Sequence, residues 1–301
     1  MLPAHLRPPA ADGGGRRAPH PSPTLTTASA MAASAVPWFS LTYLDRHKLR
    51  GEGDALREPS GLALCPDGSA LWTVSDDSRH LVLIDPEGQP IPGRSFRTGE
   101  EGLEALALDP AGRILHAVQE DTTTLLSLDL EDQRVVQRQP LAAMEGYAAV
   151  AELFEQGPAN KGLEGLSVHS GSGALFALKE GQPRLMLEIA PDLSAIRHVR
   201  RLGPGQGFVD SVISDAELDL SGLCHQPGGD RFWIISDRAS RLFLYDWQND
   251  AVIQSALLAY GRRGELHCID KAEGVAVDPQ RQRLYVVSDS EARLYVFDLR
   301  H

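Results

Sequence analysis

The stretch GLEGLSVHSGSGALFALKE, residues 162–180, contains two short apolar runs joined by a turn rich in Gly and Ser. A third short run, LMLEI at residues 185–189, follows after a second Gly- and Pro-containing turn. Runs of this length, with alternating patterning and turn residues at their ends, are typical of β-strands. The stretch therefore predicts three successive strands that run antiparallel to one another.

The same pattern occurs five times along the chain. The first runs align without gaps: EPSGLALCPDG from residue 58, GLEALALDPAG from 102, GLEGLSVHSGS from 162, DLSGLCHQPGG from 219 and KAEGVAVDPQR from 271. Second and third apolar runs follow in every copy, and the first four copies add a fourth run. Four-stranded units repeated in this way form the blades of a β-propeller, which surround a central channel. The sequence predicts an all-β, five-bladed β-propeller.

The fifth copy ends at residues 294–301 without a fourth strand, and a strand-like run, WFSLTYLD (38–45), precedes the first copy. An open ring would leave an exposed strand edge, so we expect the N-terminal run to complete the last blade as its outer strand. The remaining segments are too short for another blade: 142–160, 203–218 and 260–270. We expect a helix within the first of them, over one rim, with a six-bladed ring as the alternative if that segment hides a degenerate blade.

Residues 1–36 are rich in Pro, Ala, Gly and Ser and contain no aromatic side chain. This composition predicts a disordered tail, followed by a single propeller domain over residues 37–301. The tail lacks the continuous apolar stretch of a signal peptide, and no run in the chain is long enough to span a membrane. We expect a cytoplasmic monomer, with a periplasmic or secreted location as the alternative.

Composition and charge narrow the classes of partner. Hydrophobic residues make up 42% of the chain and charged residues 23%, as in ordinary globular proteins. The formal net charge of −12 argues against a nucleic-acid partner, because phosphate binding needs clustered Lys and Arg. The three cysteines, Cys65, Cys224 and Cys268, have no metal-finger spacing, so we expect reduced residues in the core.

Acidic residues recur at two positions of the repeat. One polar residue precedes the Gly or Ala of each first strand: Ser60, Glu104, Glu164, Ser221 and Glu273. An acid ends each second strand, 16 residues later in every blade: Asp76, Glu120, Glu180, Asp237 and Asp289. The start of one strand and the end of its antiparallel neighbour lie at the same face, so both sets should surround one mouth of the channel. Where Ser stands at the inner position, Glu58 and Asp219 lie two residues earlier.

Clustered carboxylates raise one another's pKa unless a positive charge lies among them. Calcium accepts about six to eight oxygen ligands in loose geometry, whereas zinc and copper prefer His and Cys, which the repeat does not supply here. The sequence predicts a divalent cation, calcium first, with these ligands: Glu104, Glu164, Glu273, Glu58 and Asp219. The five outer acids are expected to support the ligands or to stabilise hairpin turns, since Asp commonly bonds to neighbouring backbone.

Several of these segments resemble the SdiA-regulated family of bacterial β-propellers. The matching pieces are EPSGLAL, NKGLEGLSV, DLSGLCHQP and KAEGVAVD, each followed by its SD or KE turn, and the likeness extends over about residues 40–300. The resemblance implies a propeller that binds a metal, without assigning a reaction. Many members are exported or membrane-anchored, whereas this sequence has no clear anchor. The chain is more weakly similar to esterase-like phytase domains and to calcium-dependent lactonase propellers, which place a cation at the same mouth.

Two classes of function fit these observations. One is a non-enzymatic propeller that binds a cation and presents its loops to a small-molecule or protein ligand. The other is a calcium-dependent hydrolase of small esters, lactones or phosphoesters, which needs a base within reach of the attacking water. His267 precedes Glu273 in a loop and is the histidine placed to overhang the acidic mouth, whereas His169 and His225 follow their inner strands and belong to the opposite face.

Overall fold

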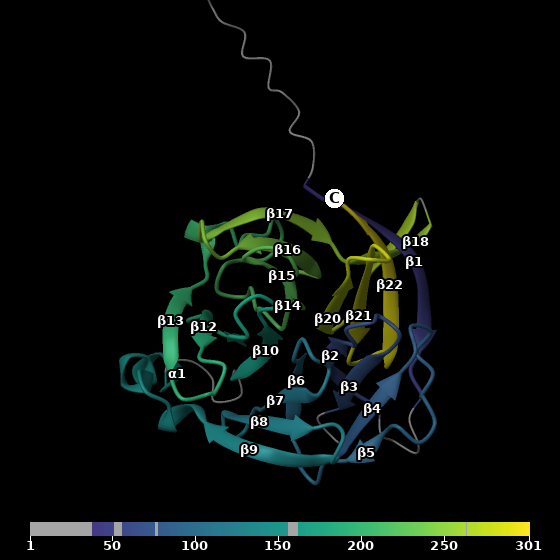
Figure 1. Ribbon diagram of the computed structural model, residues 1–301. Helices are drawn as coiled ribbons and strands as arrows, with labels where there is room; N and C mark the ends of the chain where they lie inside the picture. Colours follow the sequence, from purple (N-terminus) through teal and green to yellow (C-terminus); the bar gives the residue numbers. More distant parts are fainter. Residues whose placement is uncertain (1–37, 51–55, 76–77, 156–161, 263) are drawn as a thin grey trace, which may run out of the picture. The chain divides into compact units, whose positions relative to one another are not determined.

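The computed structural model describes residues 38–50, 56–75, 78–155, 162–262 and 264–301. Within these residues the chain forms five four-stranded antiparallel sheets and one separate two-stranded hairpin. Figure 1 shows the five sheets following one another around a common axis, with the first strand of each sheet nearest the centre. The prediction of a five-bladed β-propeller is confirmed, and the six-bladed alternative is wrong.

Each blade is one sheet, named here in order from its inner to its outer strand. Blade 1 contains β2 (Pro59–Leu64), β3 (Leu71–Ser75), β4 (His80–Ile84) and β5 (Phe96–Arg97). Blade 2 contains β6 (Leu103–Leu108), β7 (Ile114–Gln119), β8 (Thr124–Asp129) and β9 (Arg134–Pro140). Blade 3 contains β10 (Leu163–Val168), β11 (Leu175–Lys179), β12 (Leu185–Ile189) and β13 (Ile196–Arg201). Blade 4 contains β14 (Gly222–Gln226), β15 (Arg231–Ser236), β16 (Arg241–Asp246) and β17 (Ala251–Leu257). Blade 5 contains β20 (Ala272–Asp278), β21 (Arg283–Ser288), β22 (Arg293–Arg300) and β1 (Ser40–Lys48).

The N-terminal strand closes the ring, as predicted. β1 runs antiparallel to β22, with register from Ser40 opposite Arg300 to Lys48 opposite Arg293. Just before β1, the ring of Phe39 packs edge-on against Trp233 of blade 4 with ring centroids 4.8 Å apart. The first residues of the propeller therefore hold the last two blades together.

Apolar side chains form five buried clusters, one at each interface between neighbouring blades. At the inner strands a large residue of one blade meets a small one of the next. Leu166 of blade 3 packs with Ala105 and Ala107 of blade 2, and Leu62 of blade 1 packs with Ala276 of blade 5. The alternation of large and small residues in the repeat thus fits the narrow space near the axis.

Blades approach one another so closely at the axis that two inner positions require glycine. A Cβ atom on Gly222 would lie 2.1 Å from the carbonyl oxygen of Glu273 in blade 5. A Cβ atom on Gly274 would lie 2.6 Å from the carbonyl oxygen of Ser60 in blade 1. Both contacts are with backbone, which cannot turn aside as a flexible side chain can.

The segment at 142–160 differs from the single helix that its sequence suggests. It contains short pieces instead: η1 (Leu141–Ala143), η2 (Tyr147–Ala149) and α1 (Ala151–Glu155). Gly146, with φ of 86°, interrupts the helical path, and a Cβ there would lie 2.9 Å from the carbonyl oxygen of Ile196. Residues 156–161 lie outside the described residues.

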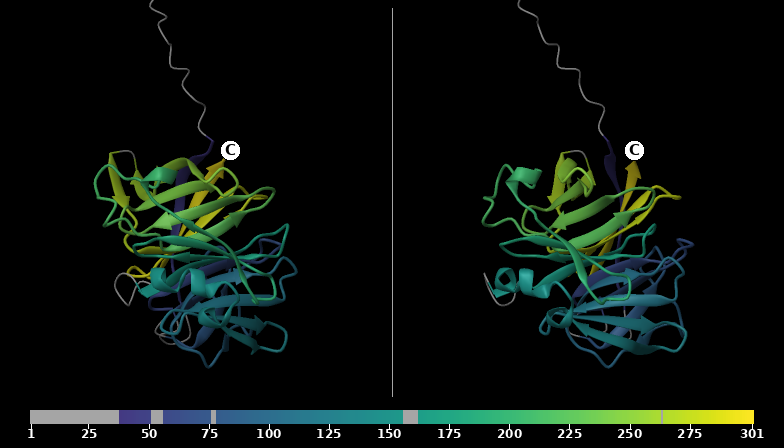
Figure 2. Two further views of the ribbon diagram at one scale, coloured as in Figure 1. Left: turned by 90° about the vertical axis from the view of Figure 1, so that its left-hand side faces the viewer. Right: turned by 60° about the vertical axis from the view of Figure 1, so that its left-hand side comes forward.

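Two other insertions carry small elements, η3 (Pro204–Gln206) and a hairpin of β18 (Ala259–Arg262) with β19 (Glu265–Cys268). All three insertions connect an outer strand to the next inner strand, so they stand at the face where inner strands begin. In the left panel of Figure 2 the teal helical segment and the yellow-green hairpin lie toward the same side. These insertions border the mouth at which the acids were predicted.

The three cysteines are free thiols, as expected, but they do not all lie in the core. Cys268 is exposed on β19, which corrects the prediction for that residue, and Cys65 and Cys224 are half-buried. None of the described helices has the length and apolarity needed to cross a membrane. The predicted disordered tail, residues 1–36, lies outside the described residues, and the domain boundary there stays a prediction.

Candidate functional site

The three inner glutamates occupy β-bulges. In blade 3 the register between β10 and β11 shifts between Leu163 and Gly165, so Glu164 is the residue that the pairing skips. Glu104 in β6 and Glu273 in β20 occupy the same skipped position. A bulge inserts one extra residue, bends the strand and re-aims a side chain, and bulges are common beside functional sites. In blades 2, 3 and 5 the bulge therefore removes one glutamate from the strand pairing and re-aims its side chain.

The outer acids begin the hairpin turns that follow the second strands. The carbonyl oxygens of Glu120, Asp237 and Asp289 each accept the N–H of the residue three positions later. The N–H of Glu120 donates to Gly102, and the N–H of Asp289 donates to Lys271, at 3.1 and 3.0 Å. These turns are thus built by the main chain, and Glu120, Asp237 and Asp289 line the mouth of the channel.

The inner and outer acids meet in one cavity of about 510 Å³. Ser221, Arg238 and Lys271 complete its lining. It is lined by eight of the ten acids that the repeat singles out: Glu104, Glu120, Glu164, Glu180, Asp219, Asp237, Glu273 and Asp289. The spacing of 16 residues therefore locates a cavity that blades 2 to 5 build together.

Three other candidates have different positions. Glu58 is exposed and does not line the cavity; its N–H donates to the hydroxyl of Ser75 at 3.3 Å. Asp76 lies outside the described residues. His267 is exposed on β19 with its ring centroid 5.6 Å from that of Tyr260, and it does not line the cavity. The hairpin pairing that places His267 beside Tyr260 was not visible in the sequence.

Basic and polar groups occupy part of this acidic surface. Lys271 forms an ion pair with Asp289. The carboxylate of Asp219 accepts bonds from the hydroxyl of Ser236 at 2.7 Å and from the N–H of Arg238 at 3.1 Å. Asp219 is thus tied to the end of β15, a role that its place in the repeat did not indicate.

Burial, together with neighbouring carboxylates, raises the pKa of three acids in this lining: Asp219, Asp237 and Glu273. Burial, and then the charges of Asp289 and Glu104, raise the pKa of Glu273 to about 9. Burial, and then the charge of Asp219, raise the pKa of Asp237 to about 6. Without a cation, Glu273 is therefore protonated at neutral pH, which reduces its repulsion by Asp289 and Glu104. A bound cation would reduce the same repulsion.

Carboxylate and hydroxyl oxygens are the donors that calcium prefers, so the chemistry of the lining fits this ion. Within the described ranges, however, no three His, Cys, Asp or Glu side chains gather closely enough to hold one ion. A cation bound here would draw carboxylates inward or be held partly through water. The lining is an acidic well with suitable ligands rather than a preassembled metal cage.

A ring of apolar side chains, one from each inner strand, forms the floor of this well: Leu62, Leu106, Leu166, Leu223 and Val275. The space left among them is about 10 Å³. A single water molecule needs roughly this much room, so a hydrated ion does not fit. The floor separates the acidic mouth from the opposite end of the channel.

Comparison with known proteins places the chain in a family. The profile of the family described as SdiA-regulated matches residues 57–298. The chain belongs to this family. The match confirms the resemblance that the repeated strand motifs carry.

Two solved structures are similar to this chain, and the one with a TM-score above 0.5 agrees with the fold. Glutaminyl cyclase from Myxococcus xanthus is 14% identical, with a TM-score of 0.60 over 86% of this chain and 96% of that chain. The β-propeller domain of Cps50 (Swd1) from Myceliophteria thermophila is also 14% identical, with a TM-score of 0.45 over 81% of this chain and 65% of that chain. No sequence among curated proteins matches this chain. At these identities the structural likeness concerns the fold alone.

Proposed function

We propose that this protein binds a divalent cation, calcium first, in the acidic mouth and presents the surrounding loops to a small-molecule or protein ligand. The observation that carries the proposal is the convergence of eight carboxylates in one cavity with an apolar floor. Only two basic side chains, Arg238 and Lys271, belong to the described lining. The excess of negative charge in a recessed site favours cations over anions.

The inner residues are the proposed ligands. Glu104, Glu164 and Glu273 lie at bulges that turn them toward the channel. Ser221, at the equivalent position of blade 4, donates its hydroxyl to the carbonyl oxygen of Ala272 at 2.8 Å, and its oxygen could still coordinate a cation. The outer acids would accept bonds from coordinated water or balance charge. When bound, calcium would supply a positive centre able to coordinate an oxygen of a ligand. The three insertions at this face would then contact that ligand.

A small organic cation is a second candidate occupant. The cavity of about 510 Å³ is far larger than a single ion requires, and the described residues contain no tight group of three metal ligands. An amine could reach several carboxylates at once without drawing them together. The calcium-dependent hydrolase has less support, because His267 does not line the cavity.

Calorimetry on protein depleted of metal with EGTA tests this proposal. We expect saturable calcium binding and a rise in the unfolding midpoint Tm, because a ligand that binds only the folded state stabilises it. Replacing both Glu104 and Glu164 with Gln should weaken calcium binding by at least about tenfold. Glu87→Gln, at an exposed acid in a turn of blade 1, should leave binding unchanged.

Spermidine and magnesium, titrated in the same way, separate the two occupants. Tighter binding of spermidine than of calcium would assign the site to organic cations. The absence of both a heat of binding and a Tm shift with every cation would overturn the proposal.

A further inference from the structure

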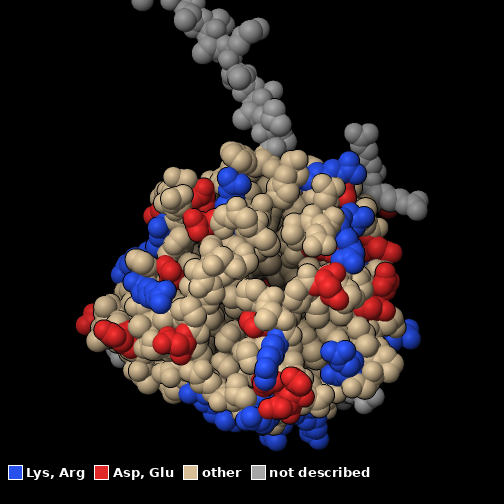
Figure 3. All heavy atoms as spheres, viewed as in Figure 1, with Lys and Arg blue, Asp and Glu red and all other residues tan. Residues whose placement is uncertain are grey.

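A second cavity, of about 340 Å³, opens at the end of the channel opposite the acidic mouth. Its floor is the same ring of five apolar side chains that closes the acidic well. Figure 3 shows this face in space-filling form, with a central hollow bordered mostly by residues other than Lys, Arg, Asp and Glu. The two cavities are therefore separate and differ in chemical character.

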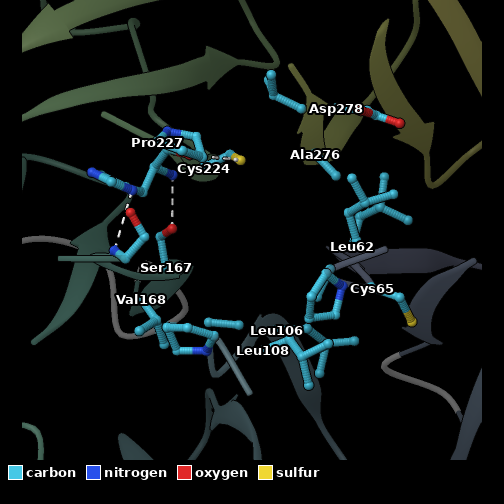
Figure 4. A pocket seen from close by; sticks show the side chains of 18 of the residues that line it. Leu62, Cys65, Leu106, Leu108, Ser167, Val168, Cys224, Pro227, Ala276 and Asp278 are labelled. Carbon is cyan, nitrogen blue, oxygen red and sulfur yellow. Dashed lines mark hydrogen bonds between the residues drawn. The ribbon is translucent and has the colours of Figure 1, made fainter. Parts of the chain in front are cut away.

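Two further positions of each inner strand build the walls of this apolar pocket. The position after the floor residue carries a small side chain in all five blades: Ala63, Ala107, Ser167, Cys224 and Ala276. The next position carries the residues nearer the opening: Leu64, Leu108, Val168, His225 and Val277. Small side chains between two larger rings leave the space that the pocket occupies, as Figure 4 shows from close by.

The two acids that line this pocket, Asp109 and Asp278, bind groups of their own turns. Asp109 accepts the N–H groups of Arg113 and Ile114 at 2.7 and 2.9 Å. Asp278 forms an ion pair with Arg281 at 2.7 Å and also accepts its N–H. Arg281 balances the charge of Asp278, and backbone N–H groups of its own turn hold the carboxylate of Asp109.

The His225 ring is also neutral. Its Nε2 lies 2.7 Å from the carbonyl oxygen of Gly229, an acceptor only, so Nε2 carries the hydrogen. Its Nδ1 then accepts the N–H of Ser170 at 3.4 Å. Burial lowers the pKa of His225 to about 4 and raises the pKa of the Cys224 thiol to about 11, so both groups are uncharged at neutral pH.

Ser167 gives the apolar pocket a buried hydroxyl, whereas Ser170 and Gln280, which also line it, are exposed. The Ser167 side chain is buried, and its hydroxyl oxygen accepts the N–H of His225 at 2.7 Å (Figure 4). A serine hydroxyl can accept and donate at the same time. Among the described residues the Ser167 hydroxyl makes no second hydrogen bond, so its hydrogen can be donated to a ligand.

We propose that the apolar pocket binds a small, uncharged, largely hydrocarbon molecule with one hydrogen-bond acceptor that contacts Ser167. Known ligand pockets begin at about 300 Å³ and combine apolar walls with few polar groups. An apolar cavity of about 150 Å³ holds benzene, so a pocket about twice as large suits a molecule of roughly a dozen non-hydrogen atoms. An anionic ligand would lose its hydration without gaining a partner charge, because the described lining contains no Lys or Arg.

Three probes of similar size test the proposal by calorimetry or ligand-observed NMR: benzylacetone, butylbenzene and phenylbutyrate. We expect saturable one-to-one binding of benzylacetone, weaker binding of butylbenzene, which lacks the acceptor, and binding of anionic phenylbutyrate weaker by at least about tenfold. Absence of saturable binding of both uncharged probes, or equal affinity for phenylbutyrate, would overturn the proposal.

Variants locate the probe. Val168→Phe fills the pocket and should weaken benzylacetone binding by at least about tenfold, whereas Val136→Phe, the same change at a valine 43% exposed on the outer strand β9, should not. Ser167→Ala should abolish the preference for benzylacetone over butylbenzene while butylbenzene still binds, which also shows that the variant is folded. Unchanged binding in Val168→Phe would place the probe elsewhere, and an unchanged preference in Ser167→Ala would remove Ser167 from the contact.

Discussion

Glu273 combines three features of the acidic well: a bulged position, burial and acidic neighbours. In metal-free protein its pKa is about 9, against 4.5 for an ordinary Glu, so between these values the folded state keeps a proton that the unfolded state releases. Stability must then fall as pH rises through this window. We expect the Tm measured in EGTA to fall by several degrees toward pH 9, and Glu273→Gln to flatten this dependence.

The exposed acid Glu87 provides the control for this pH series, because Glu87→Gln should keep the slope of the unaltered protein. Saturating calcium should reduce the slope as well, since a bound cation favours the ionised carboxylate. If Glu273→Gln and the unaltered protein had the same slope, Glu273 would titrate as an ordinary acid.

The spacing of acids in the repeat predicted the lining of the well, because every blade repeats one antiparallel hairpin and returns to the same face. It failed for Glu58, which precedes its strand and is positioned by contacts of blade 1 rather than by the repeat. It also could not show that Asp219 caps the end of β15 through Ser236. Positions that every hairpin repeats follow its register, whereas the contacts of Glu58 and Asp219, which precede the inner position, come from the tertiary structure.

At the scale of the element, the inner strands depend on close approach between backbones. Gly222 lies where a Cβ would meet the carbonyl oxygen of Glu273, so Gly222→Ala must displace β14 or β20. Overpacking of this kind costs about 1–3 kcal/mol, and we expect a loss of this size in unfolding free energy from urea denaturation. Gly205→Ala, where a Cβ meets nothing within 4 Å, should change stability little. Equal stability of the two variants would show that the blades can separate without cost.

The insertion at 142–160 shows where local pattern is insufficient. Its run of Ala, Glu and Leu favours a helix, but Gly146 adopts a left-handed conformation against Ile196, and the helix breaks there. That contact comes from blade 3, some 50 residues later in the chain, where an isolated bridge also joins Glu145 to Ala195. The strands were predictable because five aligned copies show the same pattern. The insertion occurs once, so no second copy could test its predicted helix.

In the whole propeller, residues from the two ends of its sequence close the ring. Phe39 is 1% exposed, packs against Trp233, and exchanges backbone bonds with the side chain of Gln254 in blade 4. This contact lies beside the pairing of β1 with β22, so it joins blade 4 to the strand that completes blade 5. Each blade buries its apolar faces only against its neighbours, so weakening one interface weakens the ring.

We therefore expect Phe39→Ala to lower the unfolding free energy by about 3–5 kcal/mol, as for other buried phenylalanines. Leu44→Ala, on the adjoining strand β1 but 45% exposed, should lower it by far less. Fluorescence of Trp233 would follow the closing interface, and a second probe at Trp72 would follow the interface between blades 1 and 2. Coincident urea transitions at both sites would show that the ring unfolds as one unit. If Phe39→Ala shifted the transition at Trp233 while leaving that at Trp72 in place, the blades would unfold separately, and closure by β1 would stabilise only its own interface.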